Sequence, residues 1–148
     1  MTHITRSREI AASPAAVWEM LADFGSLSAW ADSVDHSCVL NSADHARPIG
    51  LTRRVQTGRN TFVETIVEFE PGRVLAYQIS GVPRGFSVSN RWNVGTAGAG
   101  TTTVTLTSTV SMHSQVLRPI GERLFARLMA RRSQELLTSL ARALEGTP

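Results

Sequence analysis

The sequence contains no lysine and a single cysteine, Cys38, among its 148 residues. All 15 basic residues are therefore arginines, and their scattered distribution argues against a nucleic-acid-binding surface. The lack of lysine together with abundant alanine is typical of a GC-rich, actinobacterial type of genome. A lone cysteine excludes an internal disulfide, and no apolar leader segment is evident, so we expect a cytoplasmic protein.

Long apolar runs are also missing. No stretch approaches the roughly 18 apolar residues that a membrane-spanning helix needs. Linkers rich in proline, glycine and serine are absent, so we expect one domain over residues 1–148 that is large enough to bury a substantial core. Phosphate-binding loops, Ser-His-Asp triads and paired-carboxylate motifs do not occur. We expect neither a cofactor nor a metal.

The longest periodic pattern covers residues 115–145 and predicts a helix that begins near Pro119. Its apolar residues form two sets at helical spacing, Leu117, Ile120, Leu124 and Leu128, followed by Leu136, Leu140 and Leu144. At about 100° per residue the second set lies more than a quarter turn from the first. The helix therefore either bends near residues 131–133 or its two halves face different surroundings.

Alternating patterns predict seven strands, at residues 3–11, 34–40, 50–57, 61–69, 74–80, 86–94 and 103–112. Two short helices follow the first strand. Ser13 caps the first of them, Pro14 begins it and Gly25 ends it, and residues 26–30 form a further turn. An antiparallel sheet with one apolar face and a long amphipathic helix can cover each other. We therefore predict an α+β fold in which a curved seven-stranded sheet surrounds the C-terminal helix.

The hairpin formed by the third and fourth predicted strands carries a pair of opposite charges. If Thr57 opposes Thr61 across a turn at residues 58–60, Arg54 faces Glu64, and with a loop one residue longer Arg53 faces Glu64 directly. If the pair lies on the inner face, beside Leu51 and Val55, it would grip or polarise a carbonyl or carboxylate in an apolar pocket. On the outer face it would be an ordinary cross-strand ion pair, and the sequence leaves both placements open.

Further candidates for a ligand site lie along the chain. Trp30 would stack on a ring-shaped ligand or fill the core. Asn90 and Ser108 interrupt apolar strand faces, so each needs a hydrogen-bond partner in the protein or in a ligand. His36 offers a general acid or base near neutral pH, whereas a metal site built on His36 and Cys38 lacks evident further ligands. The remaining candidates for the cavity wall are Tyr77, Trp92, Leu106, Leu124 and Leu128, and a core role explains the first two equally well.

Several segments occur in a characteristic order: residues 12–24 (ASPAAVWEMLADF), Trp30, residues 36–38, residues 50–53, Glu64, Pro71, residues 75–77 and residues 100–104. In this order and spacing they resemble the SRPBCC or START-like superfamily, in particular its polyketide cyclase/dehydrase branch. The resemblance implies a helix-grip (Bet v 1-like) fold with a hydrophobic cavity between the sheet and the long helix. It implies less about chemistry, because the superfamily includes lipid and hormone binders, aromatase/cyclases and proteins with no known activity.

Two functions are compatible with these observations. The first is binding of an apolar small molecule, such as a lipid, polyketide or aromatic metabolite, by a monomer or homodimer. The second is an aromatase/cyclase in which Arg53, Tyr77 and His36 fold a poly-β-keto chain and promote aldol closure and dehydration; the resemblance implies that Arg53 orients the substrate. A weaker third hypothesis is that the arginine-rich helix binds a protein partner. A cyclase requires a titratable group within reach of the ligand, whereas a binding protein requires only shape and apolar walls.

The cavity hypothesis also makes a prediction for the two apolar sets of the long helix. The first set, Leu117 to Leu128, should line the cavity or its mouth. The second set, Leu136 to Leu144, should pack tightly against the far end of the sheet.

Overall fold

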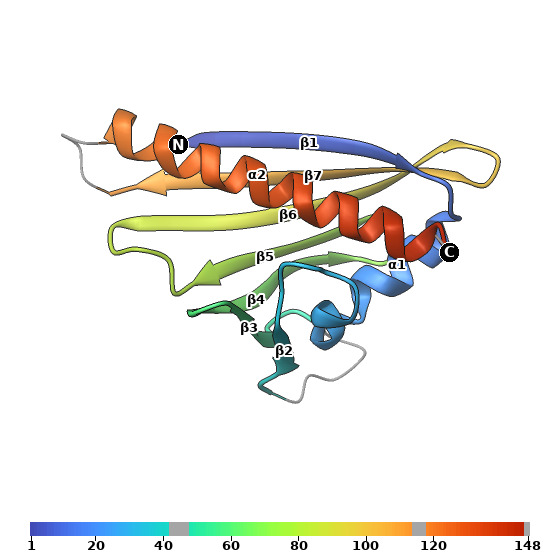
Figure 1. Cartoon of the computed structure of the whole chain (residues 1–148), viewed down its shortest axis with the longest axis horizontal. Coiled ribbons are helices and arrows are strands. Elements are labelled where there is room, and N and C mark those ends of the chain that lie inside the picture. Colours follow the sequence, from blue (N-terminus) through green and yellow to red (C-terminus); the bar gives the residue numbers. More distant parts are fainter. Residues whose placement is uncertain (42–47, 114–117, 147–148) are drawn as a thin grey trace.

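The computed structural model of the chain describes residues 1–41, 48–113 and 118–146. Its seven strands form one antiparallel sheet in the order β1-β7-β6-β5-β4-β3-β2, and a long helix crosses one face of that sheet (Figure 1). The predicted α+β fold is confirmed. The strands are β1 (Thr2–Ile10), β2 (His36–Val39), β3 (Thr52–Thr57), β4 (Asn60–Glu70), β5 (Val74–Ser80), β6 (Phe86–Gly98) and β7 (Thr101–Met112). The helices are α1 (Pro14–Ala22), a 3₁₀ helix (Phe24–Ala29) and α2 (Arg118–Leu144).

The first helix begins as predicted but ends earlier. Ser13 Oγ accepts a hydrogen bond from Ala16 N at 3.2 Å, and Pro14 occupies the first turn. The helix ends at Ala22 and a 3₁₀ helix follows, so Gly25 does not act as the helix stop. A side chain at Gly25 would collide with Val39 of β2, and glycine is therefore needed there because the 3₁₀ helix packs closely on β2.

The hairpin of β3 and β4 has a tighter turn than the sequence pattern suggested. Thr57 pairs with Asn60 across a two-residue turn, and Gly58 adopts a φ of 59°, which such turns favour. The predicted turn over residues 58–60 is therefore one residue too long, and a shorter loop, not the longer one considered, brings Arg53 opposite Glu64. This register places Arg53 directly opposite Glu64.

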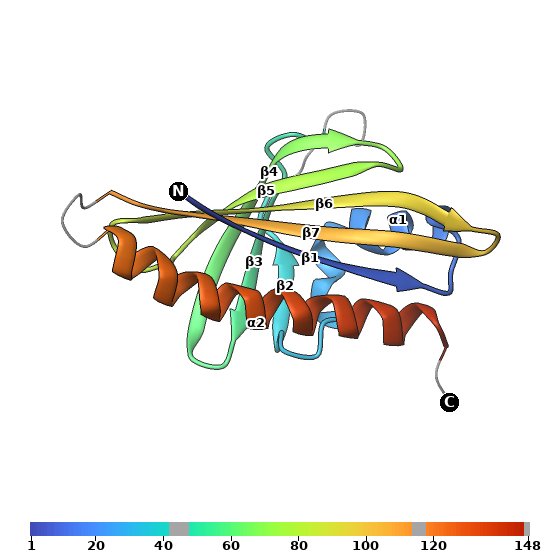
Figure 2. The ribbon, with the colours of Figure 1, turned by 90° about the horizontal axis from the view of Figure 1, so that it is seen from above.

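The sheet curves so that β3 and β2 come round toward the side on which α2 lies (Figure 2). The inner face of α2 is continuous, with buried residues spaced three or four apart: Glu122, Ala126, Met129, Ser133, Leu137 and Leu140. None of the described helices is long and apolar enough to span a membrane.

The prediction for the two apolar sets of α2 holds for the second set and fails for most of the first. Leu136 and Leu140 are buried, and Leu144 packs partly buried against the core. Ile120 and Leu124 instead point outward with 64% and 61% of their surface exposed, and Leu117 lies outside the described residues. The spacing of the aliphatic residues misled the prediction, because Phe125, Ala126 and Met129 occupy the inward positions of that half.

An acidic residue occupies one of these inward positions. Glu122 is buried, with Oε1 accepting from Thr2 Oγ1 and Oε2 accepting from Met112 N, both at 2.9 Å. These bonds satisfy its carboxylate and tie the N-terminal end of α2 to β1 and β7. At this end the polar bonds of Glu122 therefore act together with the apolar packing of Ala126 and Met129 on the sheet.

Candidate ligand cavity

A cavity of about 560 Å³ lies between the sheet and the middle of α2, from Phe125 to Leu136. This volume falls within the range of about 300–1,000 Å³ that is usual for small-molecule sites. Most of its walls are apolar, formed by Leu27, Val34, Val55, Phe62, Ile79, Val82, Pro83, Val88, Phe125, Leu128, Met129 and Leu136. The polar side chains that reach it are Asn60, Glu64, Tyr77, Asn90, Arg131, Arg132 and Glu135.

The Arg53–Glu64 pair lies on the inner face of the sheet. Only 3% of Arg53 and 8% of Glu64 is exposed, which excludes the outer-face placement. Arg53 Nε and Nη2 both contact Glu64 Oε1, at 2.7 and 2.6 Å, and Arg53 Nη1 donates to Phe24 O at 3.0 Å. The guanidinium also stacks on the rings of Phe24 and Tyr77, with its Cζ 3.8 and 4.8 Å from their centroids. Arg53 is thus held entirely by protein groups.

The charged group that faces the cavity is the carboxylate of Glu64 rather than the guanidinium of Arg53. Glu64 lines the cavity and Arg53 does not. Both contacts from Arg53 go to Oε1, and among the described residues no hydrogen bond reaches Oε2. Since no buried polar side-chain atom of the described chain is left without a partner, Oε2 must be accessible from the cavity. It is an acceptor available to a ligand.

A chain of buried hydrogen bonds leads from α2 to the hydroxyl of Tyr77. Ser133 Oγ lies 3.2 Å from Ser108 Oγ, and Ser108 Oγ donates to Asn90 Oδ1 at 2.6 Å. Asn90 Nδ2 and Trp92 Nε1 then donate to the Tyr77 hydroxyl at 3.3 and 3.2 Å. The 2.6 Å distance from Ser108 Oγ is typical of an O–H donor, whereas the longer distances to the Tyr77 hydroxyl are typical of N–H donors. The Asn90 amide is therefore oriented with its oxygen toward Ser108 and its nitrogen toward Tyr77.

The Tyr77 hydroxyl is consequently available as a hydrogen-bond donor. Two N–H donors occupy its acceptor positions, and among the described residues nothing accepts its own O–H. Burial, and then the negative charge of Glu64, raise the pKa of Tyr77 above its usual 10.0, against smaller opposing contributions that begin with Arg53. The phenol therefore stays protonated at neutral pH and presents a hydrogen-bond donor to the cavity.

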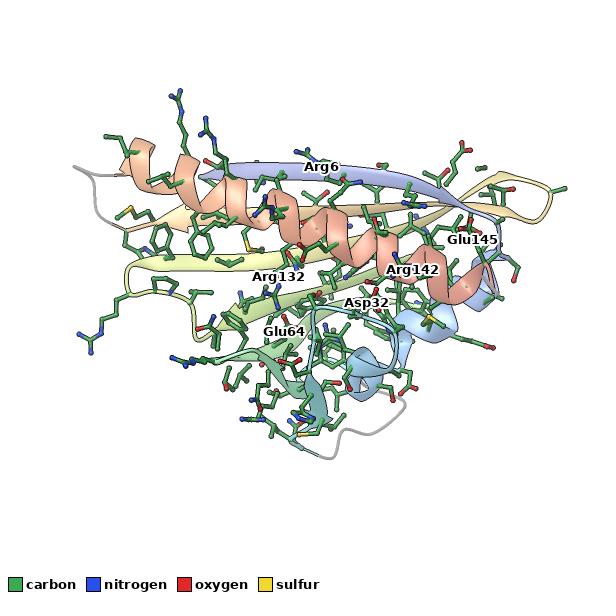
Figure 3. All side chains as sticks on the ribbon, viewed as in Figure 1. Arg6, Asp32, Glu64, Arg132, Arg142 and Glu145 are labelled. Carbon is green, nitrogen blue, oxygen red and sulfur yellow. The ribbon has the colours of Figure 1, made fainter. Side chains whose placement is uncertain are left out.

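Exposed lining residues mark the mouth of the cavity. Asn60 and Pro83 lie on the sheet side, and Leu128, Arg131 and Glu135 lie on the helix side. Next to them Arg132 bridges the two sides, since its Nη2 donates to Thr57 Oγ1 at 2.8 Å and its guanidinium lies 5.3 Å from the ring of Phe62. Figure 3 shows Arg132 and Glu64 between α2 and the strands below it.

A family profile described as polyketide cyclase / dehydrase and lipid transport matches residues 1–145. The chain belongs to this family. No curated protein matches the sequence closely enough to count as a relative.

Solved structures show the same START-like, Bet v 1-like fold. The ZhuI aromatase/cyclase from Streptomyces sp. R1128 is 19% identical with a TM-score of 0.77, over 97% of this chain and 93% of that one. A START superfamily protein from Mycobacterium smegmatis is 18% identical with a TM-score of 0.69, over 97% and 94%. Ara h 8.0201 is 12% identical with a TM-score of 0.76, over 99% of both chains. At these identities the similarity establishes the fold alone.

In this member of the polyketide cyclase/dehydrase family, the residues singled out from the sequence fall into three groups. Glu64, Tyr77, Asn90 and Leu128 line the cavity. Behind its wall lie Arg53, Trp92, Leu106, Ser108 and Trp30, whose indole packs edge to face on Trp92 with centroids 6.2 Å apart. His36, Cys38 and Leu124 are exposed and away from the cavity.

The exposed residues require corrections. His36 lies on an outer position of β2, so it does not meet a ligand in this cavity. Within the described ranges no group of three or more potential ligands could hold a metal. Leu124 points away from the sheet because the inward turn of α2 is set by Ala126 and Met129.

Several residues that line the cavity were not among the candidates from the sequence. Phe125 and Met129 are spaced four apart and lie one position after the leucines that were chosen, so their own periodicity contained the signal. Phe62 lies near the start of β4, and its place at the mouth depends on the contact with Arg132.

Proposed function

We propose that the protein binds an apolar small molecule that carries both a hydrogen-bond acceptor and a hydrogen-bond donor, as a hydroxylated aromatic ketone or quinone does. The observation that carries this proposal is that, among the described residues, the Tyr77 O–H has no acceptor and the nearby Glu64 Oε2 has no donor. A carbonyl oxygen would accept from Tyr77, and a hydroxyl group would donate to Glu64. The apolar walls supply the remaining contact area.

The positions of the two groups favour a ligand in which acceptor and donor lie close together. Glu64 pairs with Ile79, and Tyr77 pairs with Ile66, so Glu64 and Tyr77 are diagonal neighbours on the inner face of β4 and β5. A ligand offering only apolar surface would leave both groups unpaired in a desolvated site, which is costly. Selectivity for hydroxy-carbonyl compounds follows from that cost.

A matched set of three planar ligands tests the proposal. Anthracene offers neither group, anthraquinone offers acceptors, and 2-(hydroxymethyl)anthraquinone offers both, with a hydroxyl that cannot bond to its own carbonyl. We expect affinity for the wild-type protein, measured by quenching of tryptophan fluorescence, to rise in that order. Native mass spectrometry of the purified protein provides an independent search for a co-purified apolar molecule.

Two conservative variants separate the contributions. Tyr77→Phe should reduce binding of anthraquinone by about tenfold, because a hydrogen bond to a buried group contributes about 1–1.5 kcal/mol, and should strengthen binding of anthracene, because no phenol O–H is then left unpaired. Glu64→Gln should remove the preference for the hydroxylated compound over anthraquinone. Arg73→Gln, at an exposed turn, is the control. Equal affinity of the wild-type protein for all three ligands, or the same ranking in Tyr77→Phe, would refute the proposal.

A second candidate function is supported by the same pair of groups. In an aromatase/cyclase, the Glu64 carboxylate would take a proton from the carbon next to a ketone, and the Tyr77 O–H would stabilise the enolate oxygen that forms. The enolate carbon would then attack a second carbonyl and form the new ring bond, after which water is lost. These roles replace the one first considered for His36. The similar fold of an aromatase/cyclase supports this candidate without identifying a substrate.

Enolisation is measurable separately from binding. In deuterated water, a bound methyl ketone such as 2-acetonaphthone should exchange the hydrogens of its methyl group faster with the wild-type protein than with Glu64→Gln. NMR spectroscopy follows the loss of the methyl signal. If exchange is no faster than in buffer while the ketone is bound, the protein is a binder and not a cyclase.

A further inference from the structure

Three large apolar side chains form a ridge on the outer side of α2. Ile120, Leu124 and Leu128 recur every four residues and are 64%, 61% and 64% exposed. We call these three residues the outer ridge. A continuous apolar strip of this kind on a helix that is otherwise well packed indicates a contact with something outside the chain.

Arginines run alongside the outer ridge. Arg123, Arg127 and Arg131 also recur every four residues and are exposed. Within the described part of the chain none of the three makes a hydrogen bond or an ion pair. The one acid between residues 121 and 134, Glu122, is buried beneath the helix and bonded to Thr2 and Met112. The outer side of this half of α2 is therefore apolar and uniformly positive.

The charge pattern distinguishes between possible occupants. A second copy of the chain, pairing ridge to ridge, would bring two sets of three arginines together with few exposed acids to neutralise them, which is unfavourable. An anionic lipid surface matches both features, since acyl chains accept the ridge while phosphate groups meet the guanidinium groups. The long arginine side chains reach the headgroup level as the leucines enter the acyl boundary.

We propose that the outer ridge and its arginines dock the protein on anionic lipid bilayers, with α2 lying in the plane of the membrane surface. Leu128 belongs to the outer ridge and also lines the cavity, and Arg131 lies at the cavity mouth. Docking by this face therefore places the mouth at the membrane surface, where an apolar ligand enters or leaves without crossing water. The docking surface does not depend on the identity of that ligand.

Flotation with vesicles tests the proposal. The wild-type protein should float with vesicles of phosphatidylcholine mixed with phosphatidylglycerol, and should stay behind with vesicles of pure phosphatidylcholine. Raising the salt concentration should weaken the binding, because the arginine contribution is screened. Ile120→Ser/Leu124→Ser should reduce the apparent affinity by more than about tenfold, because two apolar side chains no longer enter the bilayer. Arg123→Gln/Arg127→Gln should reduce it by roughly twentyfold, at about fivefold per arginine.

Matched controls remove the same charge or the same kind of side chain elsewhere. Arg73→Gln/Arg91→Gln changes the net charge equally at a turn and on the outer side of the sheet. Val39→Ser/Val67→Ser removes two exposed apolar side chains, 44% and 45% exposed, from β2 and β4. Both controls should float like the wild-type protein, and thermal unfolding shows whether each variant is folded.

Several results would overturn the proposal. One is a wild-type protein that ignores anionic vesicles or binds pure phosphatidylcholine equally well. Another is a folded Ile120→Ser/Leu124→Ser variant that floats like wild type. A third is sedimentation velocity showing a wild-type dimer that the same variant converts to a monomer, which would assign the outer ridge to a second copy. None of these outcomes affects the proposed ligand of the cavity, which is tested without lipid.

Discussion

The two halves of α2 lie on the same sheet with opposite relations to it. Residues 134–144 press Leu136, Leu137 and Leu140 into the main core, and all three are buried. Residues 118–133 border the cavity through Phe125, Leu128 and Met129, and they leave Ile120, Leu124 and Leu128 largely exposed. We call residues 134–144 the filled end of α2, because their side chains pack in the core. We call residues 118–133 the hollow end, because they border the cavity and expose apolar side chains.

The anchoring contacts differ in the same way. At the filled end Arg142 pairs with Asp32 at 2.6 Å, and Glu145 Oε2 accepts from Ala11 N at 3.1 Å (Figure 3). At the hollow end the carboxylate of Glu122 links α2 to β1 and β7. Polar anchors hold both ends, so the middle of the hollow half need not fill the space under it. Function and stability are therefore concentrated in different parts of one element.

The largest effect on stability is expected at the buried ion pair of Arg53 and Glu64. Arg53→Met should lower the free energy of unfolding by about 3–5 kcal/mol, because Glu64 loses its partner in a buried site. The double variant Arg53→Met/Glu64→Leu should lie closer to wild type than this single variant. Urea unfolding of both proteins measures the difference. A double variant as unstable as the sum of the two single changes would show that Arg53 and Glu64 are not energetically coupled, which would contradict this prediction.

The comparison of the two halves predicts a second contrast. Leu137→Ala at the filled end should cost about 2–5 kcal/mol of unfolding free energy, because it opens a void in a packed core. Leu124→Ala at the hollow end should change it by less than about 0.5 kcal/mol, since the side chain is exposed. Similar costs at both positions, measured by urea unfolding, would remove the distinction between the halves.

The third prediction concerns Tyr77 in the cavity wall and how the free energy of unfolding changes at high pH. Tyr77 is the only tyrosine, so the ultraviolet absorbance of phenolate reports on it alone. Because burial raises the pKa of Tyr77 above 10.0, the unfolded chain loses this proton before the folded protein does. The contribution to stability is complete below about pH 10 and is lost as the pH rises through the folded value, at up to about 1.4 kcal/mol per pH unit.

The control for this titration uses a Cys38→Ser background, because thiols also titrate at alkaline pH. On that background Tyr77→Phe should flatten the fall in unfolding free energy above pH 10. A native phenolate titration at the usual value of 10.0 would contradict the desolvated environment described for this hydroxyl.

The sequence predicted most of the fold because its elements have strong local signals. Ser13 and Pro14 specify the start of α1, and alternation of apolar residues specifies β5 to the residue. The predicted burial of Leu136 and Leu140 was also correct, because the pattern and the inner face of α2 coincide there. Such signals act over a few residues and need no knowledge of what lies across the sheet.

The candidate site was only partly predictable. Arg53 and Glu64 were identified as a pair, but their register depended on Gly58 adopting a left-handed conformation. The donor character of Tyr77 depends on Asn90 and Trp92 of the neighbouring strand, which no local pattern reveals.

The sequence by itself determined the order of the elements, the antiparallel sheet and the long covering helix, since hydrophobic periodicity fixes which elements need a partner. Only the tertiary structure decided which side of α2 faces the sheet in its first half. That choice follows from the cavity and from the bonds of Glu122, which turn Ile120 and Leu124 outward against their hydrophobicity. The rotation of a helix about its axis is set by the sum of its contacts, and a one-dimensional pattern does not contain that sum.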